Sequence, residues 1–298
     1  MNNLITVFTP TYNRANTLMS LYRSLAAQTS HDFEWLIVDD GSTDDTEELV
    51  ERLKKETTQF PIRYYQQSNG GKHTAINKGV SLARGYLFFI VDSDDYLTKD
   101  AIGKVISWER SIVRKEHFAG ISGNRGFSET ELIGATFEGE FVDASALERE
   151  KYNISGDKAE VYYTDVLRKY PFPVFENERF LTESVAWNRM AADHYKIRWF
   201  NQIIYITEYR EDGLTKRYTQ LLSENPRGYA LDVVERIKVF HYNRKRKDSE
   251  YFNYYLTVKK SGTGYAAAAE YLGIGRLQLL RSILFYYGGV LKRKVTGR

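Results

Sequence analysis

The sequence predicts an α/β fold in which a single, mainly parallel sheet carries helices on both faces and is followed by a helical C-terminal extension. Strand-like and helix-like patterns alternate over the first hundred residues. The strand-like runs are apolar almost throughout, which is typical of parallel strands buried on both faces. Beyond Leu214 the apolar spacing is helical to the end of the chain. We therefore expect a domain over residues 1–215 and a helical, basic region over residues 216–298.

Four strands are expected in the first hundred residues, at Leu4–Phe8, Phe33–Val38, Ile62–Tyr65 and Tyr86–Val91. The helices between them show apolar residues three or four apart, as in Leu18, Leu21 and Leu25. The stretch 118–175 is irregular and rich in Gly, Glu and aromatic residues, and there we expect mixed strands and loops around a pocket. A helix over 180–192 and a strand over 202–207 are expected after it.

Composition excludes several classes of site. The 298 residues include no cysteine, so disulfides and thiolate zinc sites are excluded, and a reducing compartment such as the cytoplasm fits. The five histidines are scattered, and neither a signal-peptide pattern nor an apolar run of about 20 residues is present. Charge is divided: residues 236–298 hold 14 Lys+Arg against 3 Asp+Glu, whereas the rest is net acidic. This asymmetry indicates an anionic partner for the C-terminal region.

Acidic clusters follow two of the expected strands. The second strand ends in Val38-Asp39-Asp40-Gly41-Ser42 and the fourth in Val91-Asp92-Ser93-Asp94-Asp95. In an open parallel sheet, ligands bind at the carboxyl ends of the strands, so both clusters are expected to point into one crevice. Carboxylates this close repel one another unless a cation or a donor-rich ligand compensates them. Oxygen ligands favour Mg²⁺, Mn²⁺ or Ca²⁺ over zinc. A pair of solvated acidic turns would give the same pattern without a ligand.

An ordered set of motifs carries a resemblance to a known family. Thr9-Pro10-Thr11-Tyr12-Asn13-Arg14, Val38-Asp39-Asp40-Gly41-Ser42-Thr43-Asp44, Asn77-Lys78-Gly79 and Asp92-Ser93-Asp94-Asp95 occur in this order. Over about the first 110 residues the chain resembles the family 2 glycosyltransferases of the GT-A fold, which has a single Rossmann-like sheet.

The resemblance implies a nucleotide-binding loop. Pro10, Thr11 and Tyr12 resemble the segment that holds the base, with Tyr12 stacking on it. Asp40, or its neighbour Asp39, resembles the carboxylate that accepts the base N–H. The simpler reading of Tyr12 is a residue that caps the sheet.

The resemblance also implies a diphosphate and metal site. Lys72 lies where a basic residue approaches the nucleotide, although it also fits a solvated lysine at a helix start. Asp92, with Ser93, resembles the ribose-side part of the Asp-x-Asp motif. Asp94, with Asp95, resembles the ligand of Mn²⁺ or Mg²⁺.

A catalytic base is expected near Thr182-Glu183, where the family has a Glu-Asp pair. Glu183 is then the base for an inverting reaction, and a helix-start Glu favoured by the helix dipole is the simpler reading. Asp157, Asp165 and Glu178 are further candidates for the base. Arg210 is a candidate for binding the diphosphate.

The resemblance implies transfer of a sugar from a nucleoside-diphosphate sugar, with UDP the expected nucleotide, to a saccharide or lipid-linked saccharide in cell-surface polysaccharide assembly. The sequence has neither the Gln-x-x-Arg-Trp motif nor the membrane helices of processive polysaccharide synthases, which favours transfer of one sugar per visit. The rivals are a sugar nucleotidyltransferase and a non-catalytic nucleotide-sugar-binding module. The apolar, aromatic and basic pattern of residues 244–294 suits an anionic membrane surface at the inner face of the cell membrane. Packing on the catalytic domain or a homo-oligomer contact fits the same pattern, and the acidic crevice gives nucleic-acid binding no support.

Overall fold

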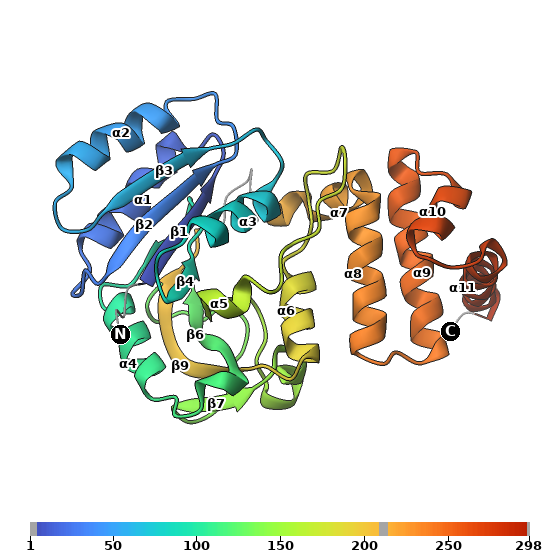
Figure 1. The fold of residues 1–298 in the computed structure, drawn as a ribbon. Helices are drawn as coiled ribbons and strands as arrows, with labels where there is room; N and C mark the ends of the chain where they lie inside the picture. The colour runs from blue at the N-terminus through green and yellow to red at the C-terminus, as the bar shows by residue number, and fades with distance from the viewer. Residues whose placement is uncertain (1–4, 209–213, 297–298) are drawn as a thin grey trace. The chain divides into compact units, whose positions relative to one another are not determined.

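The computed structural model describes residues 5–208 and 214–296, with side chains over 5–208 and 217–286. The chain forms two compact units. The first comprises Met1–Pro171 and Met190–Tyr209, and the second comprises Phe172–Arg189 and Arg210–Arg298. The first unit contains the sheet and the second is helical (Figure 1). Residues 172–189 thus group with the C-terminal helices.

The first unit is built on a nine-stranded sheet in the order β3-β2-β1-β4-β8-β6-β9-β5, with β7 paired to β9. Strands β1 to β4 pair in parallel, as expected, and β6 is parallel to β9. The remaining pairs are antiparallel. The strands are β1 (Ile5–Thr11), β2 (Phe33–Asp39), β3 (Ile62–Gln66), β4 (Leu87–Ile90), β5 (Tyr96–Leu97), β6 (Phe118–Gly126), β7 (Phe141–Ala144), β8 (Lys158–Tyr163) and β9 (Lys196–Ile206).

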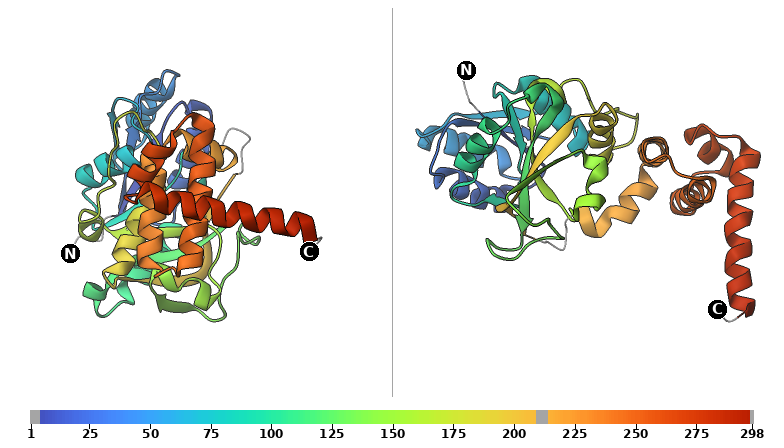
Figure 2. Two further views of the ribbon diagram at one scale, coloured as in Figure 1. Left: turned by 90° about the vertical axis from the view of Figure 1, so that its right-hand side faces the viewer. Right: turned by 90° about the horizontal axis from the view of Figure 1, so that it is seen from below.

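Helices cover both faces of this sheet (Figures 1 and 2). Ile5 and Val7 point into a core shared with α1 (Ala15–Ala26), α2 (Thr46–Glu56) and α4 (Ala101–Arg110). Side chains alternate along a strand, and the Phe8 ring therefore faces α3 (Lys72–Leu82) on the opposite side. A Cβ at Gly79 of α3 would lie 2.2 Å from that ring, so this helix packs closely. The predicted α/β arrangement is confirmed.

Strand β6, an interior strand of the sheet, lies in the stretch that the sequence marks as irregular. Its glycines lower strand propensity, yet they are required by close approach of neighbouring strands. A Cβ at Gly120 would lie 2.0 Å from the carbonyl oxygen of Val161, and one at Gly123 would lie 2.8 Å from Ile204. These glycines make the strand difficult to predict from the sequence. They also allow it to lie between its neighbours in the sheet.

The second unit has its own apolar core among helices. Tyr254, Val258 and Leu279 are completely buried in it. The predicted helical extension is confirmed, and the described helices include none that is long and apolar enough to cross a bilayer. The remaining helices are α5 (Thr164–Leu167), α6 (Ser184–Ala192), α7 (Leu214–Glu224), α8 (Pro226–Val239), α9 (Arg244–Val258), α10 (Tyr265–Tyr271) and α11 (Arg276–Thr296), with short 3₁₀ turns at Lys115–His117, Ala146–Glu148, Glu150–Tyr152 and Lys259–Ser261.

Candidate active site

Hydrogen bonds tie together the loops that follow β1 and β2. Asn13, with a left-handed φ of 52°, donates its N–H to Ser42 Oγ at 2.8 Å and accepts the Thr43 N–H on Oδ1 at 2.8 Å. Asp44 Oδ2 accepts the Ala15 N–H at the start of α1, at 3.1 Å. Because the strands are adjacent in the sheet, the two loops form one rigid rim at the carboxyl ends of the strands.

The residues at the end of β1 combine burial with exposure. Pro10 and Thr11 are buried in the strand, and the Tyr12 side chain that follows is 48% exposed. The Thr11 hydroxyl is buried without a hydrogen-bond partner among the described residues. Buried polar groups are nearly always satisfied. The end of β1 therefore offers an exposed aromatic ring beside a hydroxyl that has unused bonding capacity.

Asp39 is the first of the two acidic residues at the end of β2, and it is fully buried. Its Oδ1 accepts the Ser42 N–H at 2.7 Å, and its Oδ2 accepts the Tyr64 hydroxyl at 2.5 Å. Burial and this carboxylate together raise the pKa of Tyr64 well above its ordinary value. Asp39 thus closes the turn after β2.

Asp40, the second acidic residue, holds the loop that leads into α3. Its Oδ1 accepts the Gly70 N–H at 2.9 Å and an amide N–H of Gln67 at 2.8 Å, and its Oδ2 accepts the Gly71 N–H at 2.7 Å. Gly71 has a φ of 90°, which disfavours any other residue. Asp40 therefore sets the position of Lys72, the first residue of the helix.

Asp92 follows β4 and is flanked by two cations. Lys72 Nζ lies 2.6 Å from its Oδ1, and a terminal nitrogen of Arg125 lies 3.6 Å from its Oδ2. Burial acts to raise the pKa of Asp92, but Lys72 and Arg125 outweigh it and hold that pKa below its ordinary value. The structure thus brings Lys72 and Asp92 together at the strand ends.

Asp95 lies deeper than Asp92, and both of its carboxylate oxygens accept hydrogen bonds from protein groups. Its Oδ2 accepts the hydroxyl of Tyr205 at 2.8 Å and lies 3.6 Å from Arg125, and its Oδ1 accepts the Glu208 N–H at 3.0 Å. Burial and the neighbouring charge of Asp92 raise the pKa of the Asp95 carboxyl to about 7. This carboxyl group joins the end of β4 to the end of β9.

Asp94 is the third carboxylate of this cluster. Its side chain is about one fifth exposed, and a terminal nitrogen of Arg14 lies 3.9 Å from its Oδ2. Burial and the charge of Asp92 raise its pKa, and the opposing effects of Arg14 and Lys72 do not offset them. The neighbouring Ser93 is buried.

The described residues contain no group of three or more acidic or histidine side chains arranged to hold a metal ion. Mg²⁺-like ions are nevertheless bound through one or two carboxylates when substrate phosphates complete the coordination. Asp94, beside Asp92 at the strand ends, fits a site of that kind, in which the chain supplies few of the ligands.

Two residues of this site are not predicted by the sequence. Arg125, on β6, lies over the ring of Tyr205, on β9, with its guanidinium carbon 4.0 Å from the ring centre. The Tyr205 hydroxyl in turn accepts the N–H of Asp92 at 2.9 Å. In the sequence, Arg125 is marked by its position as a lone arginine among the glycines of β6. Its place in the site follows from the pairing of β6 with β9.

The expected base, Glu183, precedes α6 and belongs to the second unit, whereas the acidic strand ends belong to the first. Its carbonyl oxygen accepts the N–H of Ala186 at 3.1 Å, in the first turn of α6. Its side chain is half-buried. Arg210 lies outside the described residues.

Glu178 has a structural role. Its two carboxylate oxygens accept the N–H groups of Arg227 and Gly228, each at 2.8 Å, at the start of α8. This carboxylate caps the start of the helix. Asp157 and Asp165, by contrast, are exposed in the first unit, where Asp165 pairs with Arg168.

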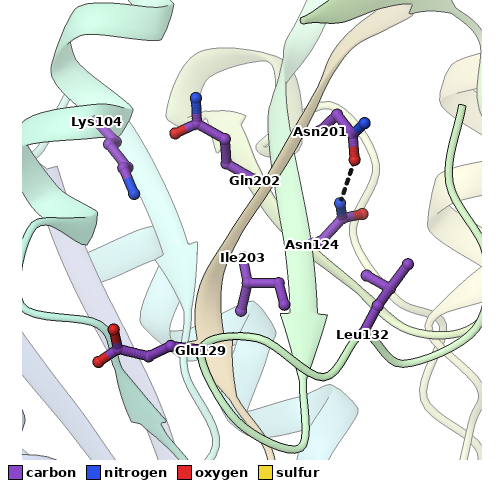
Figure 3. Close-up of a pocket in the computed structure, with 7 residues that line it drawn as sticks. All are labelled: Lys104, Asn124, Glu129, Leu132, Asn201, Gln202 and Ile203. Carbon is purple, nitrogen blue, oxygen red and sulfur yellow. Dashed lines mark hydrogen bonds between the residues drawn. The ribbon is translucent and has the colours of Figure 1, made fainter. Parts of the chain in front are cut away.

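A polar hollow of about 390 Å³ lies beside β6 and β9 (Figure 3). Asn124 and Asn201 point toward one another in it and share a 3.3 Å hydrogen bond, while Lys104 and Glu129 line its rim. It does not include the acidic residues at the strand ends.

Comparison with known proteins gives a family match for the first unit. Residues 6–111 match Glycosyl transferase family 2. An uncharacterized glycosyltransferase of Rickettsia felis is 42% identical over 98 residues, which are 33% of this chain and 16% of that protein. The glycosyltransferase GlyA of Streptococcus pneumoniae is 28% identical over 232 residues, which are 75% of this chain and 29% of that protein. The chain thus spans less than a third of the length of either relative.

Solved structures show the same fold over nearly the whole chain. S. aureus TarS 1–349 in complex with UDP is 17% identical, with a TM-score of 0.62, and the match covers 99% of this chain and 92% of that one. A mannosyltransferase of Pyrobaculum calidifontis in complex with GDP-Man and Mn²⁺ is 17% identical, with a TM-score of 0.54, and the match covers 96% and 79%.

Proposed function

Residues 6–111 of this chain are a glycosyl transferase family 2 domain on a GT-A fold, and from that premise we propose that the protein transfers a sugar from a UDP-sugar to a hydroxyl group of a saccharide or lipid-linked saccharide. The relatives named glycosyltransferases support the reaction class. The TarS complex with UDP supports the donor class. The reaction fits cell-surface polysaccharide assembly.

One observation carries the proposal: the adjacent strands β2, β1 and β4 end in three complementary features. At these ends lie the Asp40 loop, the exposed Tyr12 ring and the Lys72–Asp92 pair. An aromatic face suits a nucleobase, a carboxylate suits the base N–H or a ribose hydroxyl, and a lysine suits a phosphate. We assign the base to Tyr12 and Asp40 and the ribose to Asp92.

For the diphosphate, we propose that Asp94 holds a divalent cation, Mn²⁺ or Mg²⁺. The cation would supply charge neutralisation of the departing diphosphate. Lys72 stands beside Asp92 and is placed to contact the diphosphate when the donor is bound. Asp95, which is buried, accepts the hydroxyl of Tyr205 and thereby helps to hold the cluster in place.

For the acceptor, we propose that Glu183 takes the proton of the attacking hydroxyl group. The acceptor oxygen then bonds to the anomeric carbon of the sugar as the bond to the diphosphate oxygen breaks, and UDP leaves with the electron pair. Attack from the face opposite the leaving group inverts the anomeric centre.

Calorimetric titration of UDP into the whole chain, with and without Mn²⁺, tests the donor site. We expect Mn²⁺ to tighten UDP binding and Asp94→Asn to remove that gain while the melting temperature stays within a few degrees. The matched control is Asp165→Asn, since Asp165 is an exposed carboxylate that pairs with Arg168. Absence of UDP binding under every condition would overturn the proposal. Formation of a UDP-sugar from UTP and a sugar phosphate would favour a nucleotidyltransferase.

A further inference from the structure

Helix α11 presents an apolar stripe away from its packed side. Leu277, Leu280, Leu284 and Phe285 are 83%, 43%, 61% and 55% exposed, and their spacing places them along one side of the helix, with the exposed Arg281 among them. Leu279 and Ser282, on the other side, are completely buried. Exposed apolar residues aligned in this way on a helix are typical of an interaction surface.

A basic cluster begins α9, next to this stripe. Arg244, Lys245, Arg246 and Lys247 are exposed and occupy the first turn of the helix, which contains no acidic residue. Cations at this end are disfavoured by the helix dipole, because its partial charge there is positive. Within α9, Arg244 lies 4.0 Å from Asp248 and Arg246 lies 3.2 Å from Glu250. Among the described residues no ion pair engages Lys245 or Lys247, so these two lysines are the cations that can meet an anionic partner.

The two features belong to one helix pair. Ser282 of α11 donates to Asp248 of α9 at 2.6 Å, and Arg281 lies 3.1 Å from the same carboxylate. The hydroxyl of Tyr286 donates to the carbonyl oxygen of Lys245, at 3.2 Å. Leu284 and Phe285 therefore lie within one helical turn of Tyr286, which contacts Lys245 of the basic cluster. The sequence of α11 continues with Lys292-Arg293-Lys294, whose side chains are outside the described ones.

We propose that this surface, formed by Leu277, Leu280, Leu284 and Phe285 of α11 with the first turn of α9, binds an anionic lipid bilayer, with α11 lying in the plane of the interface. Apolar side chains on one side of a helix enter the boundary between headgroups and acyl chains, and neighbouring cations hold the anionic headgroups. A second copy of the chain would cover the apolar stripe but would bring basic clusters together. The inference rests on the proposed function in one respect: a lipid-linked acceptor would lie in the membrane that this surface binds.

The experiment is co-sedimentation of the whole chain with vesicles of phosphatidylcholine alone, or with about one third phosphatidylglycerol. We expect binding to the anionic vesicles only, and weaker binding as salt rises. Leu280→Gln/Leu284→Gln should reduce partitioning about tenfold or more, and so should Lys245→Gln/Lys247→Gln, since each exposed cation near an anionic surface contributes several-fold. All four positions are exposed, so the variants should keep the wild-type melting curve.

The matched control is Val113→Gln, because Val113 is 94% exposed in the first unit, and it should bind vesicles as the wild type does. Absence of binding to anionic vesicles at low salt overturns the proposal, as does binding that both double variants retain. The proposal is also overturned if the chain does not bind vesicles and analytical ultracentrifugation shows a dimer that the leucine variants dissociate. The stripe would then be a contact between two copies of the chain. UDP titration without vesicles tests the donor site separately, so failure of one proposal is distinguishable from failure of the other.

Discussion

Arg125 lies with its guanidinium carbon 4.0 Å from the ring centre of Tyr205, and both residues contact the Asp95 carboxyl group. The arginine also lies near Asp92, so one cation from β6 compensates two carboxyl groups from the end of β4. This arrangement explains how an acidic cluster persists at the mouth of the sheet before any cation or donor binds.

Arg125→Met should therefore destabilise the first unit. The substitution leaves Asp92 and Asp95 with less compensation in a largely buried place, and we expect the free energy of unfolding to fall by about 2–4 kcal/mol. Urea unfolding measures it. Lys54→Met is the control, because its ion pair with Glu51 is exposed and loss of such a pair costs about 0–1 kcal/mol. Equal effects of the two substitutions would show that Arg125 does not stabilise the cluster.

Tyr12→Ala tests the proposed base contact. Stacking of an aromatic side chain on a base contributes about 1–3 kcal/mol, so UDP affinity should fall about 5- to 150-fold, while Tyr12→Phe should retain most of it. The ring is half exposed, and stability should change little. Calorimetry gives the affinities and thermal unfolding the stability. Wild-type UDP affinity in the alanine variant would mean that Tyr12 only covers the end of the sheet.

The sequence predicts the part of the site in which local pattern and topology agree. The apolar runs over residues 35–38 of β2 and residues 87–91 at β4 are each followed at once by acidic residues, and parallel pairing brings these ends together. Arg125 escapes this reasoning because its partners come from β4 and β9, distant in sequence. The β6 glycines hide its strand, although close contact with Val161 and Ile204 requires them. The sequence also cannot show that the oxygens of Glu178 are committed to α8.

Lys158 predicts a pH dependence of stability. This lysine is buried, and its Nζ donates to the carbonyl oxygen of Ala135 at 3.1 Å. Burial, with the nearby charge of Arg149, lowers its pKa from 10.5 to about 8. Between these values the unfolded chain binds more protons than the folded chain, so this residue makes the free energy of unfolding rise with pH, by about 1–3 kcal/mol in total. Below the folded pKa the gain is lost.

Urea unfolding at about pH 7.5 and about pH 9.5 compares the wild type with Lys158→Met. The variant lacks the titrating group, so its free energy of unfolding should rise less between the two pH values. Lys151→Met, at an exposed lysine in the same unit, should keep the wild-type slope. Identical slopes for all three proteins would show that the buried lysine keeps its ordinary pKa.

Glu183→Gln tests the proposed general base. Glutamine keeps the size and the hydrogen-bonding oxygen of the side chain but cannot accept the acceptor's proton. We expect sugar transfer to fall by about 10² or more, the usual contribution of a general base. UDP affinity should be unchanged, because the donor residues are in the other unit. Transfer is measured as release of UDP dependent on added acceptor.

Glu178→Gln is the control that separates catalysis from folding. It weakens the cap of α8, since the carboxylate accepts two backbone N–H groups there, and we expect it to lower the free energy of unfolding by about 0.5–2 kcal/mol. Its rate per folded molecule should stay near that of the wild type. If Glu183→Gln also transfers sugar at the wild-type rate, Glu183 is not the base. Asp157 and Asp165 are then the carboxylates to substitute next, because Glu178 caps α8.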